Sequence, residues 1–373
     1  MATHPGSTRS RRSESSNRFQ PYTRKPGRSH ERGTETEQKA TKQAVPVPIQ
    51  VSSALQLAWA PATRRKYDTS VKEFISFCDK QRVPEEDRSP ASEMLLAMYA
   101  ASLVGQVAGG TISGKLAAVR AWHIQHNQAW QGSTLLQYVL KGAANATPSS
   151  SKQKRRPPVT VNMLQELHDN LDLADHLDTA VYAIATVAFY GQLRLGEICT
   201  SKDEYTAFNR ATSPSKKHLK PPHSEAGSRI LRLPWTKVKR AKGEEVAICR
   251  QLGDTDPIKA LDRHMQINEI TTGDTALASY STLQGKRKLL TVSRFMKRCN
   301  EIWIAAGRER HTGHCFRIGG TTHYLLHNVP PDAVKLAGRW SSDAFLRYWR
   351  QLDVVTTVHT ELLRSGGVRS AAR

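Results

Sequence analysis

The sequence predicts a mainly α-helical protein with a small antiparallel β-sheet, folded as two domains. Apolar residues recur every three or four positions through most of residues 51–145 and again from residue 160, as in amphipathic helices. One stretch, RILRLPWTKVK at 229–239, alternates instead, and EEVAIC at 244–249 can pair with it as a hairpin. A Ser-, Lys- and Pro-rich linker at 146–159 separates a helical N-terminal domain from a larger α+β domain at 160–365.

The charge of the chain points to a polyanionic partner. Lys and Arg number 55 and Asp and Glu 33, so 55 − 33 gives a net charge of +22 over 373 residues. No run approaches 18 apolar residues, which favours nucleic acid over a membrane as that partner. The five cysteines are scattered without a CxxC pair, and a secretory signal is missing, so we expect an intracellular protein with reduced thiols.

The first 50 residues are predicted to be a disordered basic arm. They are rich in Ser, Arg, Thr, Gly and Pro, and such a segment cannot bury enough apolar surface to offset its ordering entropy. The arm could lie on DNA phosphates, act as an import signal, or serve as a mitochondrial transit peptide, although it lacks the amphipathic face of the last. Residues 366–373 form a short basic tail.

Four helices are predicted in the N-terminal domain, at 51–145. Thr63 is positioned to cap the first, Ser92 opens the second, Gly109-Gly110 ends it, and Thr111 caps the third. The fourth, at 133–140, is short. The domain could be a plain helical bundle with solvated lysines, or its basic outer faces could bind DNA. The predicted DNA-binding residues on these faces are Arg64, Arg65, Lys66, Lys115 and Arg120.

The linker contains a second basic cluster, formed by Lys152, Lys154, Arg155 and Arg156 ahead of a Pro-Pro pair. Such a run can follow a DNA backbone between two domains, because each neutralised phosphate releases counterions. It can equally be a nuclear import signal, and both roles are compatible.

The larger domain is predicted to contain helices at 161–171, 177–190 and 292–303, with another that starts at Asp256-Pro257. The hairpin is expected to turn around Lys242-Gly243, and residues 271–288 are expected to be irregular. Further short helices are predicted after Pro330-Pro331, up to Tyr348, and at 354–363.

The segment 311–350, HTGHCFRIGGTTHYLLHNVPPDAVKLAGRWSSDAFLRYWR, carries the residues with the clearest chemistry. It holds a His-x-x-Arg pair, His314 and Arg317, then a predicted Gly-Gly turn, and ends near Tyr348. A phenol, an imidazole and a guanidinium together suggest chemistry on a phosphodiester, with the tyrosine as nucleophile. His311 and His314 with Cys315 could suggest a zinc site, but the ligand set is incomplete and we expect no metal.

This segment resembles the C-terminal signature of the tyrosine recombinases, the family of the phage integrases. Its motif GRWSSDAFLRYW resembles the transposon-borne recombinases of eukaryotes, of the Crypton or DIRS kind. The string GQLRLGE at 191–197 is similar to the family's box with the first catalytic arginine. The resemblance covers roughly residues 50–360 and implies a SAM-like core-binding domain followed by a recombinase catalytic domain. The catalytic residues that it implies are Arg194, Lys237, His314, Arg317, Trp340 and Tyr348.

The implied reaction is metal- and ATP-independent. Tyr348 would attack the scissile phosphate of double-stranded DNA, leaving a 3′-phosphotyrosine and a free 5′-hydroxyl that a second strand replaces. Glu197 would orient Arg194, and Lys237 would protonate the leaving oxygen. The resemblance also implies a tetramer on two DNA sites and, for a eukaryotic mobile element, a nuclear location.

Several alternatives stay open at this point. Arg194 could be a surface arginine paired with Glu197, and Lys237 is one of several neighbouring basic residues. The family places a His or Trp nine residues before the tyrosine, whereas here Trp340 lies eight before it and Arg339 lies nine before it. We favour Trp340 for that position. A type IB topoisomerase, or a catalytically silent DNA-binding protein derived from a recombinase, would share much of this sequence pattern.

Overall fold

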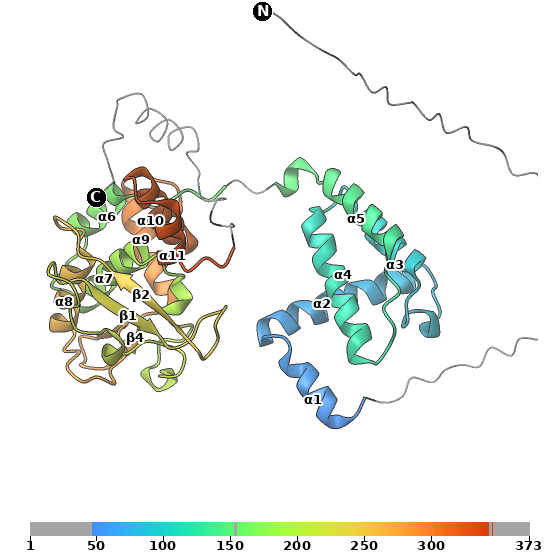
Figure 1. The fold of residues 1–373 in the computed structure, drawn as a ribbon, viewed down its shortest axis with the longest axis horizontal. Helices are drawn as coiled ribbons and strands as arrows, with labels where there is room; N and C mark the ends of the chain where they lie inside the picture. The colour runs from blue at the N-terminus through green and yellow to red at the C-terminus, as the bar shows by residue number, and fades with distance from the viewer. Residues whose placement is uncertain (1–46, 153–154, 343–344, 346–373) are drawn as a thin grey trace, which may run out of the picture. The chain divides into compact units, whose positions relative to one another are not determined.

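A computed structural model describes residues 47–152, 155–342 and 345 (Figure 1). The chain divides into two compact units, Met1–Lys152 and Gln153–Arg373, which we describe separately. Within the described ranges, no helix has both the length and the apolar character needed to cross a membrane.

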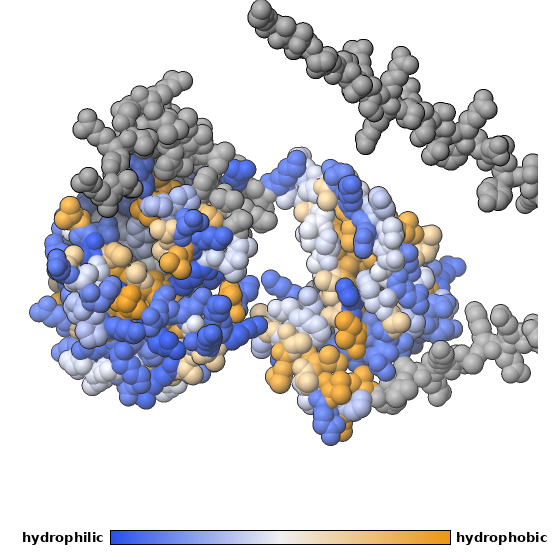
Figure 2. Space-filling model, in the orientation of Figure 1, coloured by the Kyte–Doolittle hydropathy of each residue, from blue (hydrophilic) through white to orange (hydrophobic). Residues whose placement is uncertain are grey.

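The N-terminal unit is helical. Its helices are α1 (Ile49–Leu57), α2 (Pro61–Lys80), α3 (Glu93–Ser102), α4 (Gly109–Gln125) and α5 (Thr134–Asn145), with short 3-10 turns at Glu85–Asp87 and Ser149–Ser151. Helix α2 packs on α4, and α3 packs on α5, around a core that includes Phe74, Leu96 and Ile112. The side chains of Ile49 and Leu57 on α1 are exposed and contribute to the apolar area over that helix in Figure 2.

Three of the expected helix boundaries in this unit are wrong, although Ser92 does cap α3 by accepting a hydrogen bond from Leu95 N at 3.2 Å. Thr63 and Thr111 lie inside helices that begin earlier. The Gly109-Gly110 pair starts α4 instead of ending α3, because α4 approaches α5 closely there. A Cβ on Gly109 would lie 2.5 Å from Ala144 Cα.

The C-terminal unit is an α+β domain. Its helices are α6 (Val161–Asn170), α7 (His176–Tyr190), α8 (Pro257–Ile267), α9 (Val292–Ala305), α10 (His314–Leu326) and α11 (Pro331–Ala337). Its strands are β1 (Arg229–Leu233), β2 (Glu244–Ile248), β3 (Ser279–Ser281) and β4 (Arg287–Leu289), and 3-10 turns lie at Leu195–Glu197, Tyr205–Ala207 and Lys216–His218. The fold class predicted from the sequence is therefore confirmed.

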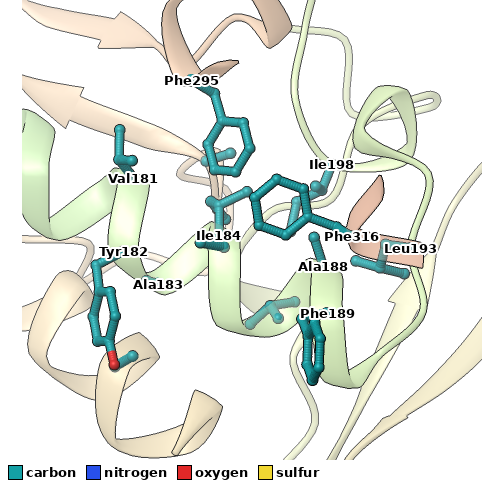
Figure 3. Packing of buried hydrophobic residues seen from close by; sticks show 14 of the residues in the cluster. Val181, Tyr182, Ala183, Ile184, Ala188, Phe189, Leu193, Ile198, Phe295 and Phe316 are labelled. Atoms are coloured by element: carbon teal, nitrogen blue, oxygen red, sulfur yellow. The ribbon is translucent and has the colours of Figure 1, made fainter. Parts of the chain in front are cut away.

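Helix α7 is the centre of this unit. It is buried along almost its whole length, and α6, α8, α9 and α10 pack around it. Figure 3 shows Phe295 of α9 and Phe316 of α10 beside Ile184 of α7, and the two phenyl rings lie 5.2 Å apart. Asp175 caps α7 by accepting hydrogen bonds from two backbone N–H groups of its first turn. The packing of these helices around α7 fixes its C-terminal end, where the candidate site begins.

The predicted hairpin is confirmed as the antiparallel pair β1–β2, with Leu231 opposite Val246. Its first strand stops at Leu233, because Pro234 has no N–H to donate to the partner strand. The expectation that residues 271–288 are irregular is wrong, since β3 and β4 form a second antiparallel hairpin there. Strands of three residues are too short to show a period in the sequence.

The Gly319-Gly320 pair lies inside α10 and is not the turn that was expected. A Cβ on either residue would overlap a backbone carbonyl oxygen, that of Val159 or that of Phe189 respectively. The two glycines therefore let α10 lie directly against α7 and against the strand-like segment that precedes α6. This close approach fixes the position of the side chains on the first turn of α10.

Two of the three glycines of α4, Gly109 and Gly114, provide a test of the close contact between α4 and α5. Replacing Gly109 by Ala should lower the free energy of unfolding by about 1–3 kcal/mol, because the new methyl group meets the α5 backbone. Replacing Gly114 by Ala, in the same helix but facing open space, should raise it by up to about 1 kcal/mol. Urea unfolding, with hydrogen exchange of α4 and α5 peptides to localise the effect, measures both. Equal effects of the two substitutions would contradict the close contact.

Candidate active site

The guanidinium of Arg317 joins three segments of the C-terminal unit. Arg317 is completely buried on α10. Its Nη1 donates to the carbonyl of Gln192 at 2.6 Å and its Nη2 to the carbonyl of Gly338 at 2.5 Å. Its Cζ lies 3.9 Å from the centroid of the Trp340 ring, as in a cation–π contact. Arg317 thus links α10 to the turn after α7 and to the turn after α11.

Both turns are shaped to fit this arginine. Gln192 is buried in a left-handed conformation, with φ +47°, and its Oε1 accepts a hydrogen bond from the Thr321 hydroxyl at 2.8 Å. Gly338 packs against the same amide, since a Cβ there would lie 2.6 Å from Gln192 Oε1 and would overlap the Trp340 indole. The roles of Gln192 and Gly338 were not predicted from the sequence. Each accepts a hydrogen bond through its backbone carbonyl from a residue far away in the chain, and such a contact has no local sequence signal.

Arg194 follows the first of these turns and shares a buried carboxylate with a second arginine. Its Nη1 donates to Glu197 Oε1 at 2.9 Å, and its backbone N–H donates to Glu197 Oε2 at 3.0 Å. Arg339 Nη2 donates to the same Oε2 at 2.7 Å. The Glu197 side chain is only 4% exposed, whereas that of Arg194 is 31% exposed. The pair expected between Arg194 and Glu197 is present, and the burial of Glu197 distinguishes it from an ordinary surface ion pair.

His314 begins α10, one helical turn before Arg317, so the two side chains project from the same face. The residue before it, Gly313, packs on the Arg194 segment, because a Cβ there would lie 2.6 Å from Leu195 Cδ1. His314 is half-buried. The structure therefore brings together the segments that carry Arg194, His314 and Arg317.

His311 has a structural role instead. It is buried; its backbone N–H donates to Asn300 Oδ1 at 2.8 Å, and its Nδ1 donates to the carbonyl of Glu309 at 2.7 Å. Cys315 is a buried small side chain in the same turn. Among the residues that the structure describes, no three His, Cys, Asp or Glu side chains are placed to hold a metal ion.

Lys237 lies at the exposed tip of the β1–β2 hairpin. The backbones of Thr236 and Arg240 pair with each other on either side of it, and the Arg240 N–H donates to the Thr236 carbonyl at 2.9 Å. No hydrogen bond or ion pair joins Lys237 to the arginine network in the described part of the chain. Tyr348, the short helix predicted to end there, and the helix predicted at 354–363 lie outside the described residues.

Comparison with solved structures identifies the fold, although the sequence matches no family model and no curated protein. The XerH site-specific recombinase, in a pre-cleavage complex with its difH substrate, aligns with a TM-score of 0.50 and 13% identity over 82% of this chain and 78% of its own. The Tn1549 transposon integrase, in complex with a circular intermediate DNA, aligns with a TM-score of 0.50 and 12% identity over 84% of this chain and 98% of its own.

The chain has the tyrosine-recombinase fold. The predicted fold is thereby confirmed for both units, because each alignment covers more than four fifths of this chain. The closer resemblance to eukaryotic transposon-borne recombinases stays a prediction.

In the N-terminal unit of this recombinase fold, three of the predicted DNA-binding residues line one groove. A groove of about 660 Å³ between α2 and the start of α4 is lined by Arg65, Lys66 and Lys115, among others. Arg65 and Lys66 are exposed, but Lys115 is partly buried and forms an ion pair with Glu73, which corrects the expectation that it is exposed. Arg64, on α2, is half-buried.

The remaining predicted DNA-binding residues lie outside that groove. Arg120 is exposed on α4. Of the linker cluster, Lys152, Arg155 and Arg156 are exposed, and Lys154 lies outside the described residues. The described basic residues of the linker are therefore accessible to a large anionic partner.

The two arginines that the resemblance implies should differ in their contribution to stability. Arg317→Ala should lower the free energy of unfolding by roughly 3 kcal/mol or more, because it leaves two buried carbonyls without their charged donor and opens a cavity. Arg194→Ala should cost less than about 1 kcal/mol, because the Arg194 guanidinium is partly solvated and the buried Glu197 carboxylate keeps its ion pair with Arg339. Urea unfolding of the two variants measures the difference, and equal losses would contradict the anchoring role of Arg317.

Proposed function

We propose that the protein cuts and rejoins double-stranded DNA by site-specific recombination, through a 3′-phosphotyrosine formed by Tyr348. The observation that supports this most is the arginine network. Arg194 and Arg317, implied as catalytic from separate sequence motifs, belong to one connected cluster in a chain with the recombinase fold. His314 begins the same helix that carries Arg317.

The charge of the network suits a phosphodiester. Arg194, Arg317 and Arg339 contribute three positive charges, and Glu197 and Glu244 contribute two negative ones, so 3 − 2 leaves one positive charge. A DNA phosphodiester carries one negative charge, and arginine binds such planar oxygen pairs with two parallel hydrogen bonds. The network is therefore close to neutral once a single scissile phosphate is bound.

The exposure of the arginines suggests an order of contact. Arg194 is the one whose side chain is open to solvent, so an incoming phosphate reaches it first. Arg317 is fully buried, with Trp340 over its face, and contacts the phosphate only after this cover moves. Engagement of DNA would thus be coupled to a displacement of the turn that follows α11.

In the proposed reaction, Tyr348 Oη forms a bond to phosphorus as the bond to the 5′-oxygen breaks. His314 accepts the phenolic proton, and Lys237 donates a proton to the leaving 5′-oxygen. Ionising a phenol of pKa about 10 at neutral pH costs roughly 4 kcal/mol. One preorganised donor to a developing oxyanion contributes about 3–4 kcal/mol, so two arginines can offset that cost. A 5′-hydroxyl of another strand then reverses the step.

Phe345 is the described residue that lies nearest to Tyr348 in the sequence. Phe345 is buried, and the ammonium of Lys335 on α11 lies 5.8 Å from the centroid of its ring. Two residues lie between Phe345 and Tyr348, and an extended chain covers at most about 11 Å in the three steps from one to the other. We propose that Tyr348 acts on a phosphate held by the arginines of its own protomer or of an adjoining one.

The basic surfaces supply the proposed DNA contacts. The groove between α2 and α4 and the linker cluster would bind phosphates on either side of the cleavage point. Of the two similar structures, the Tn1549 integrase is in complex with a circular intermediate DNA and the XerH recombinase is bound to its difH substrate. From the family resemblance of the sequence we propose that the protein acts as a tetramer on two DNA sites. We also propose that a transposable element encodes it and that the KQKRR run is a nuclear import signal.

The nucleophile can be tested with Tyr348→Phe. On a nicked suicide duplex that carries the ends of the element, the wild-type protein should form a covalent adduct that survives denaturing electrophoresis. The variant should form none, while its affinity for the duplex changes less than about threefold, because one hydroxyl contributes little to a large phosphate interface. An adduct formed by the variant would refute the assignment.

Tyr324→Phe is the matched control. Tyr324 is a largely buried tyrosine of the same unit whose hydroxyl donates to the carbonyl of Tyr190 at 2.9 Å, and burial raises its pKa. This variant should still form the adduct.

A wild-type protein that relaxes supercoiled DNA without exchanging strands would instead favour a type IB topoisomerase activity.

A further inference from the structure

Arg339 is a buried arginine in an unfavourable backbone conformation. Its φ is +56°, a region that residues other than glycine seldom occupy, and its side chain is only 6% exposed. Burial lowers the pKa of its guanidinium. The left-handed backbone and the burial of a charged side chain both destabilise the folded protein. A residue that combines them is expected to have a role that offsets this loss of stability.

Among the described residues, the side chain of Arg339 forms ion pairs with two carboxylates. Nη2 donates to Glu197 Oε2 at 2.7 Å. Nε lies 3.9 Å from Glu244 Oε2, beyond hydrogen-bond distance, and Nη1 has no hydrogen-bond partner in the structure as described. Arg339 therefore acts on its surroundings mainly through Glu197.

Glu197 divides its two oxygens between two arginines. Oε1 accepts from Arg194 Nη1, and Oε2 accepts from Arg339 Nη2 and from the Arg194 backbone. With Oε2 occupied in this way, Glu197 holds Arg194 through one nitrogen of its guanidinium. The Nε and Nη2 of Arg194 make no hydrogen bond with any described residue, and this side chain is 31% exposed.

We propose that Arg339 is a positioning residue that keeps Arg194 available for the scissile phosphate. By holding Oε2 of Glu197, it prevents the carboxylate from turning to bind Arg194 through two parallel hydrogen bonds, the arrangement that arginine and carboxylate favour. The inference rests on the proposed function. It gives Arg339 a role other than direct phosphate contact, in keeping with the burial of its side chain.

The turn that carries Arg339 is fixed by the other arginine of the site. The carbonyl of Gly338 accepts a hydrogen bond from Arg317, and the ring of Trp340 stacks on the same guanidinium. Arg339 is held between these two contacts. A chain of contacts thus runs from Arg317 through Arg339 and Glu197 to Arg194. These contacts fix the position of one catalytic arginine, as implied by the resemblance, relative to the other.

A double-mutant cycle tests this role. Single-turnover adduct formation on the suicide duplex, at saturating DNA, should be about tenfold or more slower in Arg339→Ala than in the wild type, in line with the coupling energies of contacting residues. In a Glu197→Gln background, the same substitution should change the rate less than about threefold, because the competing carboxylate charge is gone. Arg339→Lys, which retains a charge beside Glu197, should recover part of the rate.

Arg298→Ala is the matched control. Arg298 on α9 forms a comparable pair with the buried carboxylate of Asp178, with two hydrogen bonds of 2.7 Å in the same unit. Removing it should lower the urea midpoint and leave the adduct rate of the folded protein unchanged. A slowing equal to that of Arg339→Ala would mean that any lost ion pair has this effect, and would overturn the proposal.

The remaining outcomes are also decisive. If the wild type forms the adduct and Arg339→Ala forms it at the same rate, the positioning role is refuted and the proposed function stands. If Arg339→Ala slows the reaction equally with and without Glu197→Gln, Arg339 acts directly on the phosphate, which also overturns the inference. A wild type that forms no adduct would remove the proposed function, and this inference with it.

Discussion

The buried guanidinium of Arg317 is the contact on which the geometry of the site depends. A planar group with five donors can satisfy carbonyls from two separate turns and still present a face to an aromatic ring. Here those carbonyls belong to Gln192 and Gly338, and the ring belongs to Trp340. Each turn leads directly into another residue of the network, Arg194 after the first and Arg339 within the second. The site is therefore a set of short segments tied to one side chain.

Close helix packing is what makes this junction possible. Helix α10 lies against α7 at Gly320, where any larger residue would overlap the Phe189 carbonyl. This approach brings the first turn of α10 beside the turn that follows α7, within hydrogen-bond reach of Arg317. The cost of burying the arginine is offset by charge-assisted hydrogen bonds and by the stacked indole. The same burial implies that binding a phosphate deep in the site requires the Gly338–Trp340 turn to move.

Much of the fold could be predicted from the sequence because its signals are local. Asp256 before Pro257 marks the start of α8, and the alternation from Arg229 marks the first hairpin. The pairing of Arg194 with Glu197 follows from their spacing of three residues. The His-x-x-Arg spacing likewise places His314 and Arg317 on one helical face.

Other features depend on contacts between distant segments and have no local signal. The glycines at 109–110 and 319–320 resemble turn residues in the sequence, but they lie in helices that approach a neighbour closely. Gln192 and Arg339 adopt left-handed backbone conformations that their neighbouring residues do not predict. The link from Arg339 to Glu197 joins residues 142 positions apart, so only the folded chain reveals that the two arginines share a carboxylate.

We propose that this arginine network presents a DNA phosphate to Tyr348. This proposal is tested most directly by trapping the full chain on a suicide duplex, digesting the DNA and the protein, and locating the attached nucleotide by mass spectrometry. The account predicts a nucleotide joined through its 3′-phosphate to the peptide that contains Tyr348. Attachment to another residue, or through a 5′-phosphate, would contradict it.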